Sequence, residues 1–169
     1  MAEKAIDIPA RRGAAHLRLV LDQMESIRPI GGTTLITALH EAAEQIRQRA
    51  LVVIFSDLFV PPAELKHAVQ HLRFRRHDVA AFHLLHESEL TFEFDQPARF
   101  IDLEGGEPVL ADPSLIARNY RLAVKQYLAD LDEIVRTTGI DYHRVKLHER
   151  YDDVLVRFLL GRVPKRVAR

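Results

Sequence analysis

A continuous apolar run at residues 51–55 is the feature that most constrains the fold of this chain. The run is too continuous for a half-exposed strand and too short for a helix, so it predicts a parallel strand buried on both faces. Ser56 and Asp57 follow at its end. Open α/β sheets bind ligands in the crevice outside the carboxyl ends of their strands. An acid at this position therefore indicates a metal or phosphate site.

The sequence around this run alternates between helical and strand patterns. Apolar residues at helical spacing predict helices at residues 14–25, 34–49, 64–75, 113–138 and 152–162. Further strands are expected at residues 79–85 and 140–147, and Glu104-Gly105-Gly106-Glu107 predicts a hairpin between residues 98–103 and 108–111. Strands that alternate with helices imply an α/β fold: an open, mostly parallel, Rossmann-like sheet with helices on both faces.

The longest predicted helix, residues 113–138, is delimited by its end residues. Asp112 can cap its start, and Pro113 suits the first helical position. Gly139 is expected to end it, because glycine readily adopts the left-handed conformation that follows many helices.

Composition restricts the classes of function. A chain of 169 residues fits one domain, here 1–169, with an N-terminal segment at 1–13 and a basic tail at 164–169. The net charge of zero argues against a dedicated nucleic-acid binder. The absence of cysteine excludes disulfides, thiol catalysis and cysteine-ligated zinc. No apolar stretch reaches membrane-spanning length and no signal peptide opens the chain, so a cytoplasmic location is expected.

Several stretches spaced along the chain carry a family resemblance. They are Pro29-Ile30-Gly31-Gly32-Thr33-Thr34-Leu35 with Ala38-Leu39, residues 52–57, Arg76-His77-Asp78-Val79 continuing to His83-Leu84-Leu85, residues 100–107, Gly139-Ile140-Asp141-Tyr142, and residues 8–13. Together they resemble the bacterial family known as domain of unknown function 58, which has a von Willebrand factor A-like fold. Genes of this family commonly lie beside genes for MoxR-type AAA ATPases.

The resemblance implies a metal-ion-dependent adhesion site at the carboxyl edge of the sheet. In such sites an Asp-x-Ser-x-Ser loop, a threonine that opens a later helix and an aspartate that ends the fourth strand hold a divalent metal. By motif register Thr33 matches the threonine and Asp57 matches the aspartate. No Asp-x-Ser-x-Ser occurs in the sequence, so the domain is expected to be partial, truncated at its N-terminus. Mg²⁺ or another divalent cation would then bind weakly, because one carboxylate and one hydroxyl are few ligands.

The resemblance also implies a function. The chain is expected to be a non-enzymatic protein–protein interaction module that works with a MoxR-type AAA ATPase in assembling a complex. Without the family's first strand, one edge of the strand at residues 51–56 is uncovered. An exposed apolar edge is a template for pairing with another chain, so self-association through this edge is expected.

Two alternative readings of the function stay open. Asp57 followed by Pro61-Pro62 superficially resembles the phosphoacceptor turn of receiver domains. A receiver also needs an early acidic pair, which is absent, and a late lysine, for which Lys146 lies too late in the chain. The other alternative is a structural remnant without activity of its own. In that case Thr33 is simply a helix cap and Asp57 the start of a turn.

Four histidines are candidate metal ligands by position. His67 and His71 have the i, i+4 spacing of a zinc pair, but no His-Glu-x-x-His motif accompanies them, so exposed surface is expected. His83 and His86 lie at a strand end near the proposed site, and a ligand role for either is not favoured.

Other polar residues have simpler interpretations. Asp102, Glu104 and Glu107 could form an acidic site, although a charged hairpin is usually solvated. Tyr120 and Tyr127 are expected to pack on the amphipathic face of the long helix.

Overall fold

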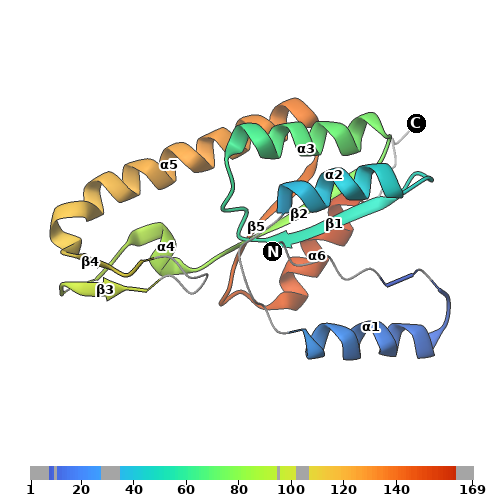
Figure 1. The fold of residues 1–169 in the computed structure, drawn as a ribbon, viewed down its shortest axis with the longest axis horizontal. Helices are drawn as coiled ribbons and strands as arrows, with labels where there is room; N and C mark the ends of the chain where they lie inside the picture. The colour runs from blue at the N-terminus through green and yellow to red at the C-terminus, as the bar shows by residue number, and fades with distance from the viewer. Residues whose placement is uncertain (1–7, 10, 28–34, 95, 102–106, 163–169) are drawn as a thin grey trace.

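Three parallel strands form the central sheet, in the order β1-β2-β5 (Figure 1). They are β1 (Leu51–Ser56), β2 (Asp78–Leu85) and β5 (Asp141–Lys146). The computed structural model describes residues 8–9, 11–27, 35–94, 96–101 and 107–162. The predicted open, parallel α/β architecture is confirmed, with β1 paired to β2 and β2 paired to β5 in parallel register.

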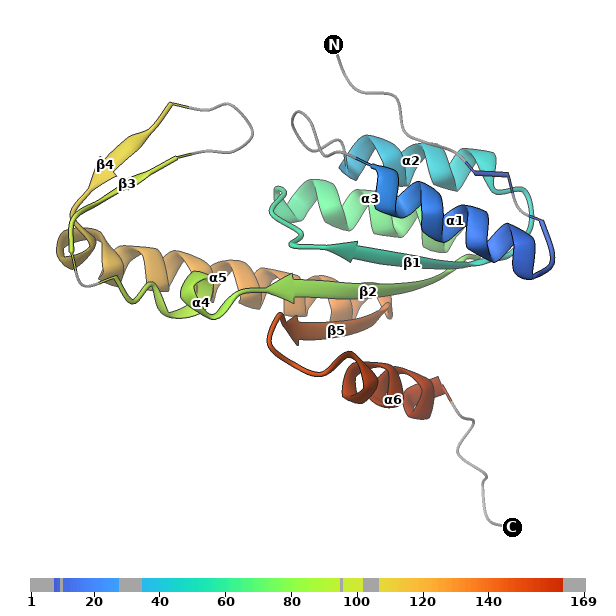
Figure 2. The ribbon, with the colours of Figure 1, turned by 90° about the horizontal axis from the view of Figure 1, so that it is seen from below.

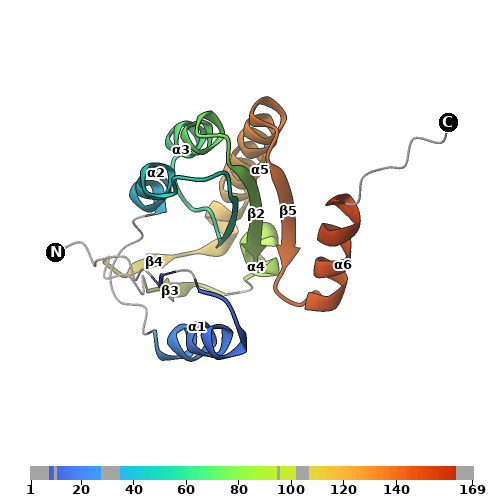
Figure 3. The same ribbon diagram turned by 90° about the vertical axis from the view of Figure 1, so that its right-hand side faces the viewer.

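Helices cover both faces of this sheet, as predicted. On one face lie α2 (Leu35–Gln45), α3 (Pro62–Phe74) and the long α5 (Pro113–Thr138), and on the other lies α6 (Tyr151–Arg162) (Figures 2 and 3). The remaining elements are α1 (Ala14–Ser26), the short α4 (Glu87–Thr91), and the antiparallel pair β3 (Ala98–Phe100) and β4 (Val109–Ala111). The predicted hairpin is thus present, with strands shorter than expected.

The middle strand, β2, joins the two halves of the core. Val79 and Ala81 pack into the cluster under α2, α3 and α5. Ala80 and Phe82 point the other way and pack against Val154 of α6. A strand covered on both sides needs apolar residues at successive positions, which explains the continuous apolar character of this segment.

The expectation that the strand at residues 51–55 is buried on both faces is wrong. Ile54 is buried, but Leu51, Val53 and Phe55 on the opposite face are 43%, 40% and 65% exposed. The reason is that α6 covers β2 and β5, while β1 lies at the edge of the described sheet. The ring of Phe55 is partly covered because it stacks on the ring of Phe82, with the ring centroids 4.8 Å apart.

Both ends of α5 fall where the sequence predicted. The Asp112 carboxylate accepts a hydrogen bond of 2.9 Å from the amide of Ser114. Gly139 follows the helix with a φ of 65°, a conformation that glycine adopts without the penalty of a Cβ. The predicted helix at residues 34–49 is shorter, because α2 ends at Gln45.

The sequence did not predict α4, and the structure explains why this helix forms. His86 precedes it, and its side chain accepts a hydrogen bond from the amide of Ser88, while the carboxylate of Glu89 accepts one from the amide of His86. These reciprocal bonds make a capping box with a histidine in place of the usual serine or threonine. Within the described residues, no helix has both the length and the apolar character needed to cross a membrane.

Packing of α5 against α3 and the sheet predicts a clear stability difference between two leucines of the same helix. Leu131 is 1% exposed in the core, whereas Leu122 is 57% exposed. Leu131→Ala should lower the free energy of unfolding by about 2–5 kcal/mol, because it leaves a cavity. Leu122→Ala should change it by less than about 0.5 kcal/mol. Urea unfolding of both variants tests this, and equal losses would contradict the packing described.

Candidate functional site

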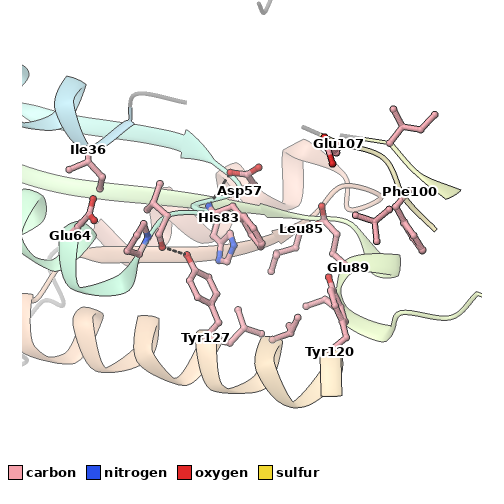
Figure 4. Close-up of a pocket in the computed structure, with 18 of the residues that line it drawn as sticks. Ile36, Asp57, Glu64, His83, Leu85, Glu89, Phe100, Glu107, Tyr120 and Tyr127 are labelled. Atoms are coloured by element: carbon pink, nitrogen blue, oxygen red, sulfur yellow. Dashed lines mark hydrogen bonds between the residues drawn. The ribbon is translucent and has the colours of Figure 1, made fainter. Parts of the chain in front are cut away.

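A cavity of about 1260 Å³ opens at the carboxyl edge of the sheet (Figure 4). Its lining comes from α2, the turn after β1, the start of α3, the end of β2, α4, α5 and the β3–β4 pair. Its lining combines acidic, aromatic and aliphatic side chains: Ile36, Thr37, Asp57, Phe59, Val60, Pro61, Glu64, His83, Leu85, Glu89, Leu90, Phe100, Ile101, Glu107, Val109, Tyr120, Val124, Tyr127 and Leu128. We refer to this cavity as the carboxyl-edge cleft.

Asp57 is held at this cleft by the turn that follows β1. Its Oδ1 accepts a hydrogen bond of 3.2 Å from the amide of Phe59, and the Ser56 hydroxyl lies 3.4 Å from the same oxygen. The Ser56 hydroxyl in turn accepts the amide of Leu58 at 3.0 Å. The side chains of Ser56 and Asp57 therefore both shape the turn. The carboxylate of Asp57 is exposed, and the backbone amide of Phe59 orients it.

Leu58 has a backbone conformation that is costly for a branched residue. Its φ is 53°, and its side chain is 2% exposed in the main core. The hydroxyl of Tyr127 donates to the carbonyl of Leu58 and lies 3.2 Å from the carbonyl of Val60. The buried side chain and the tyrosine together hold the strained turn, as is typical of backbone positions near binding sites. Sequence reasoning predicted packing for Tyr127 and missed this role.

His83 lies at the base of the cleft, between Asp57 and Tyr127 (Figure 4). It is 1% exposed, and its Nδ1 lies 2.6 Å from the hydroxyl of Tyr142. Burial lowers the pKa of the imidazole below its usual value, and the charge of Arg144 acts in the same direction, while Asp57 opposes the shift. The ring is therefore neutral near pH 7, and among the described residues its Nε2 has no hydrogen-bond partner.

Among the residues that the structure describes, four carboxylates line the cleft and no lysine or arginine does. They belong to Asp57, Glu64, Glu89 and Glu107, and all four are exposed. The sequence indicates only Asp57 and Glu107 as candidate site residues, because Glu64 and Glu89 fall in different helices with no shared motif. The fold alone brings them to one edge.

The predicted metal ligands are only partly placed by the structure. Asp57 lies at the carboxyl edge of the sheet as expected, whereas Thr33 lies outside the described residues, as do Asp102 and Glu104. Within the part of the chain that is described, no three histidine, aspartate or glutamate side chains gather closely enough to hold a metal ion. The convergence of Thr33 and Asp57 stays a prediction.

The two histidines of the predicted pair, His67 and His71, differ in exposure. His67 is exposed, as expected. His71 turns toward α2, where its Nε2 lies 2.8 Å from Glu44 and its Nδ1 lies 2.9 Å from His40. The expectation of a fully exposed pair is therefore wrong for His71, because α2 packs beside α3 and covers it.

These observations define a class of protein: an open α/β domain with an acidic, partly apolar cleft at the carboxyl edge of its parallel sheet. Residues 1–130 match the family described as Protein of unknown function DUF58. The chain belongs to this family, which confirms that part of the resemblance seen in the sequence. No curated protein and no solved structure matches the chain.

The buried imidazole predicts a pH dependence of stability. Because the pKa of His83 is lower in the folded than in the unfolded state, the unfolded chain binds the additional proton first as the pH falls below about 6.5. The contribution of His83 to the free energy of unfolding is fully present above that pH, and it is lost as the pH falls toward the pKa of His83 in the folded state. His83→Gln should therefore lose less stability than the wild type between pH 7 and pH 5.

Urea unfolding at a series of pH values measures this difference. His67→Gln, which removes an exposed histidine, is the matched control and should follow the wild type. A His83→Gln variant with the wild-type pH slope would show that His83 titrates normally in the folded chain.

Proposed function

We propose that this chain is a non-enzymatic protein–protein interaction module whose binding surface is the carboxyl edge of its sheet. The observation that carries the proposal is the carboxyl-edge cleft, with the exposed carboxylate of Asp57 in its lining. At about 1260 Å³ the cleft exceeds the range of roughly 300–1,000 Å³ typical of small-molecule sites. It has the size and mixed polarity suited to a segment of another protein.

A divalent cation is part of this proposal, through the likeness to von Willebrand factor A-like domains. Asp57 would supply a carboxylate already oriented by the Ser56–Phe59 turn, and Thr33 would supply a hydroxyl. Oxygen ligands of this kind suit Mg²⁺, which keeps several waters when few protein ligands are present. The cation would offer a coordination position to an acidic side chain of the partner. With Asp57 and Thr33 as its only proposed protein ligands, the cation would bind weakly.

The identity of the partner also belongs to the proposal. The family resemblance supports a MoxR-type AAA ATPase, with the chain acting in the assembly of a larger complex in the cytoplasm. Membership of the DUF58 family is consistent with this partner and does not itself name it.

The free edge of β1 supports self-association as a second contact. Among the described residues β1 pairs only with β2, so the backbone groups on its other side are available to a further strand. Leu51, Val53 and Phe55 add an apolar surface beside that edge. We propose that a second copy of the chain pairs there, because edge strands of this character readily add strands.

Metal binding tests the role of Asp57. Isothermal titration with Mn²⁺ should detect binding of roughly millimolar strength to the wild type, as expected for a site with few protein ligands. Asp57→Asn and Thr33→Ala should each remove most of the heat. Asp153→Asn, which neutralises an exposed aspartate on α6, is the control and should bind like the wild type. Unchanged binding by Asp57→Asn would refute the metal site.

Sedimentation velocity tests the contact through β1. The wild type should form dimers at high micromolar concentration, and Val53→Lys should shift the population to monomer, because a lysine on an edge strand opposes pairing. Leu122→Lys, at an exposed leucine on α5, is the control for added charge. A wild type that stays monomeric at the same concentration would contradict the contact.

A further inference from the structure

We propose that His40 and His71 form a binding site for a divalent transition-metal ion, of which Ni²⁺ and Cu²⁺ fit best. The two residues belong to neighbouring helices, α2 and α3, and their Nδ1 atoms are 2.9 Å apart. The site is separate from the carboxyl-edge cleft, whose lining contains neither histidine. The inference therefore goes beyond the proposed function and does not depend on it.

The packing of α2 against α3 brings the two histidines together. Each histidine is next to a core residue in the sequence, since Leu39 is 5% exposed and Leu72 is 0% exposed. The two helices lie side by side on one face of the sheet (Figure 3). Arg75 of α3 links them again, because its Nε donates a hydrogen bond of 3.1 Å to the carbonyl of Ala43. The imidazoles thus project from two backbones that the core holds in a fixed relation.

Glu44 prepares His71 to bind a metal ion. A carboxylate oxygen of Glu44 lies 2.8 Å from Nε2 of His71, and because an ionised carboxylate can only accept, Nε2 carries the ring hydrogen. In the neutral ring Nδ1 then has a lone pair, which faces Nδ1 of His40. Histidines that bind metals commonly donate their other ring hydrogen to a carboxylate in this way, which fixes the tautomer and makes the ligand nitrogen more basic.

The distance between the two nitrogens indicates which ions fit. Nitrogens that bind one ion at about 2.0–2.1 Å lie about 2.9 Å apart when the angle at the metal is 90°, and about 3.4 Å apart in a tetrahedral site. The observed separation is 2.9 Å. Square-planar and tetragonal sites have the smaller angle and are typical of Cu²⁺ and Ni²⁺, and imidazole is a suitable ligand for both ions.

Metal binding would replace the hydrogen bond between the two rings. In the metal-free chain Nδ1 of His40 donates to Nδ1 of His71, and the ring centroids are 5.2 Å apart, so the nitrogens face each other. Both rings turn about their side-chain bonds to direct two lone pairs at one ion, and His40 then carries its hydrogen on Nε2. Among the described residues no third protein ligand is close enough. The side chain of His71 is 27% exposed, so water can occupy the remaining positions.

Isothermal titration of the untagged protein with Ni²⁺ tests the site. The wild type should bind Ni²⁺, and His40→Gln and His71→Gln should each lose most of the binding heat. His67→Gln removes an exposed histidine one turn away from His71 on α3, and it should bind like the wild type. Unchanged binding by His40→Gln, or no binding by the wild type, would overturn the inference. Loss of binding in His67→Gln alone would also overturn it and would assign the ion to the i, i+4 pair on α3.

A second pair of variants tests the orienting role of Glu44. Glu44→Gln should weaken Ni²⁺ binding about tenfold, the lower end of the range for residues that orient a metal ligand. Glu41→Gln removes the same charge from another exposed position on α2 and should bind like the wild type. Equal weakening in both variants would overturn the inference, because the negative charge of α2 would then explain the binding.

Paramagnetic broadening by Cu²⁺ locates the ion and separates this inference from the proposed function. Substoichiometric Cu²⁺ should broaden the backbone amide signals around residues 40 and 71, both in the wild type and in Asp57→Asn. The same ¹H–¹⁵N spectra show whether each histidine variant is folded. Broadening confined to the carboxyl edge would overturn this inference and leave the proposed cation site at Asp57 in place. Mn²⁺ binding that Asp57→Asn does not change would refute that cation site and leave the histidine site in place.

Discussion

The contact on which the candidate site depends is the one between Tyr127 of α5 and the turn after β1. The tyrosine hydroxyl donates to the carbonyl of Leu58 and lies 3.2 Å from that of Val60. Because Leu58 has a positive φ of 53°, the turn needs such external support to persist. The same turn carries Asp57 and Phe59, so one hydrogen-bonding group on a distant helix positions both a carboxylate and an aromatic side chain of the cleft.

The sheet determines what else reaches this edge. All three strands are parallel, so their carboxyl ends meet on one side, where β2 contributes His83 and the segments after β1 and β2 contribute Asp57 and Glu89. Stability comes from elsewhere, since the two apolar clusters on either side of β2 hold the layers together. This separation allows the edge to hold a buried imidazole, and carboxylates that pair with no basic side chain in the described part of the chain, without disrupting the core.

The sequence predicted those features that depend on local pattern. The bounds of α5 followed from Asp112 and Gly139, and the alternation of strands with helices gave the α/β class. Burial of β1 on both faces was mispredicted, because an apolar run does not reveal that α6 stops short of the edge strand. The roles of Tyr127 and His83 were missed since their partners, Leu58 and Tyr142, are separated from them by 69 and 59 residues. Asp57 could be predicted as a residue of the carboxyl edge because it directly follows a strand.

The rigidity of the turn at residues 57–60 is the property that tests this account most directly. Backbone ¹⁵N relaxation of the wild type should give order parameters of about 0.85 for Asp57, Leu58 and Phe59, as in the strands. In Tyr127→Phe, which lacks only the hydroxyl, these values should fall toward about 0.6, while those of β2 stay unchanged. Order parameters already below about 0.6 in the wild type, or unaltered in the variant, would show that Tyr127 does not hold the site in place.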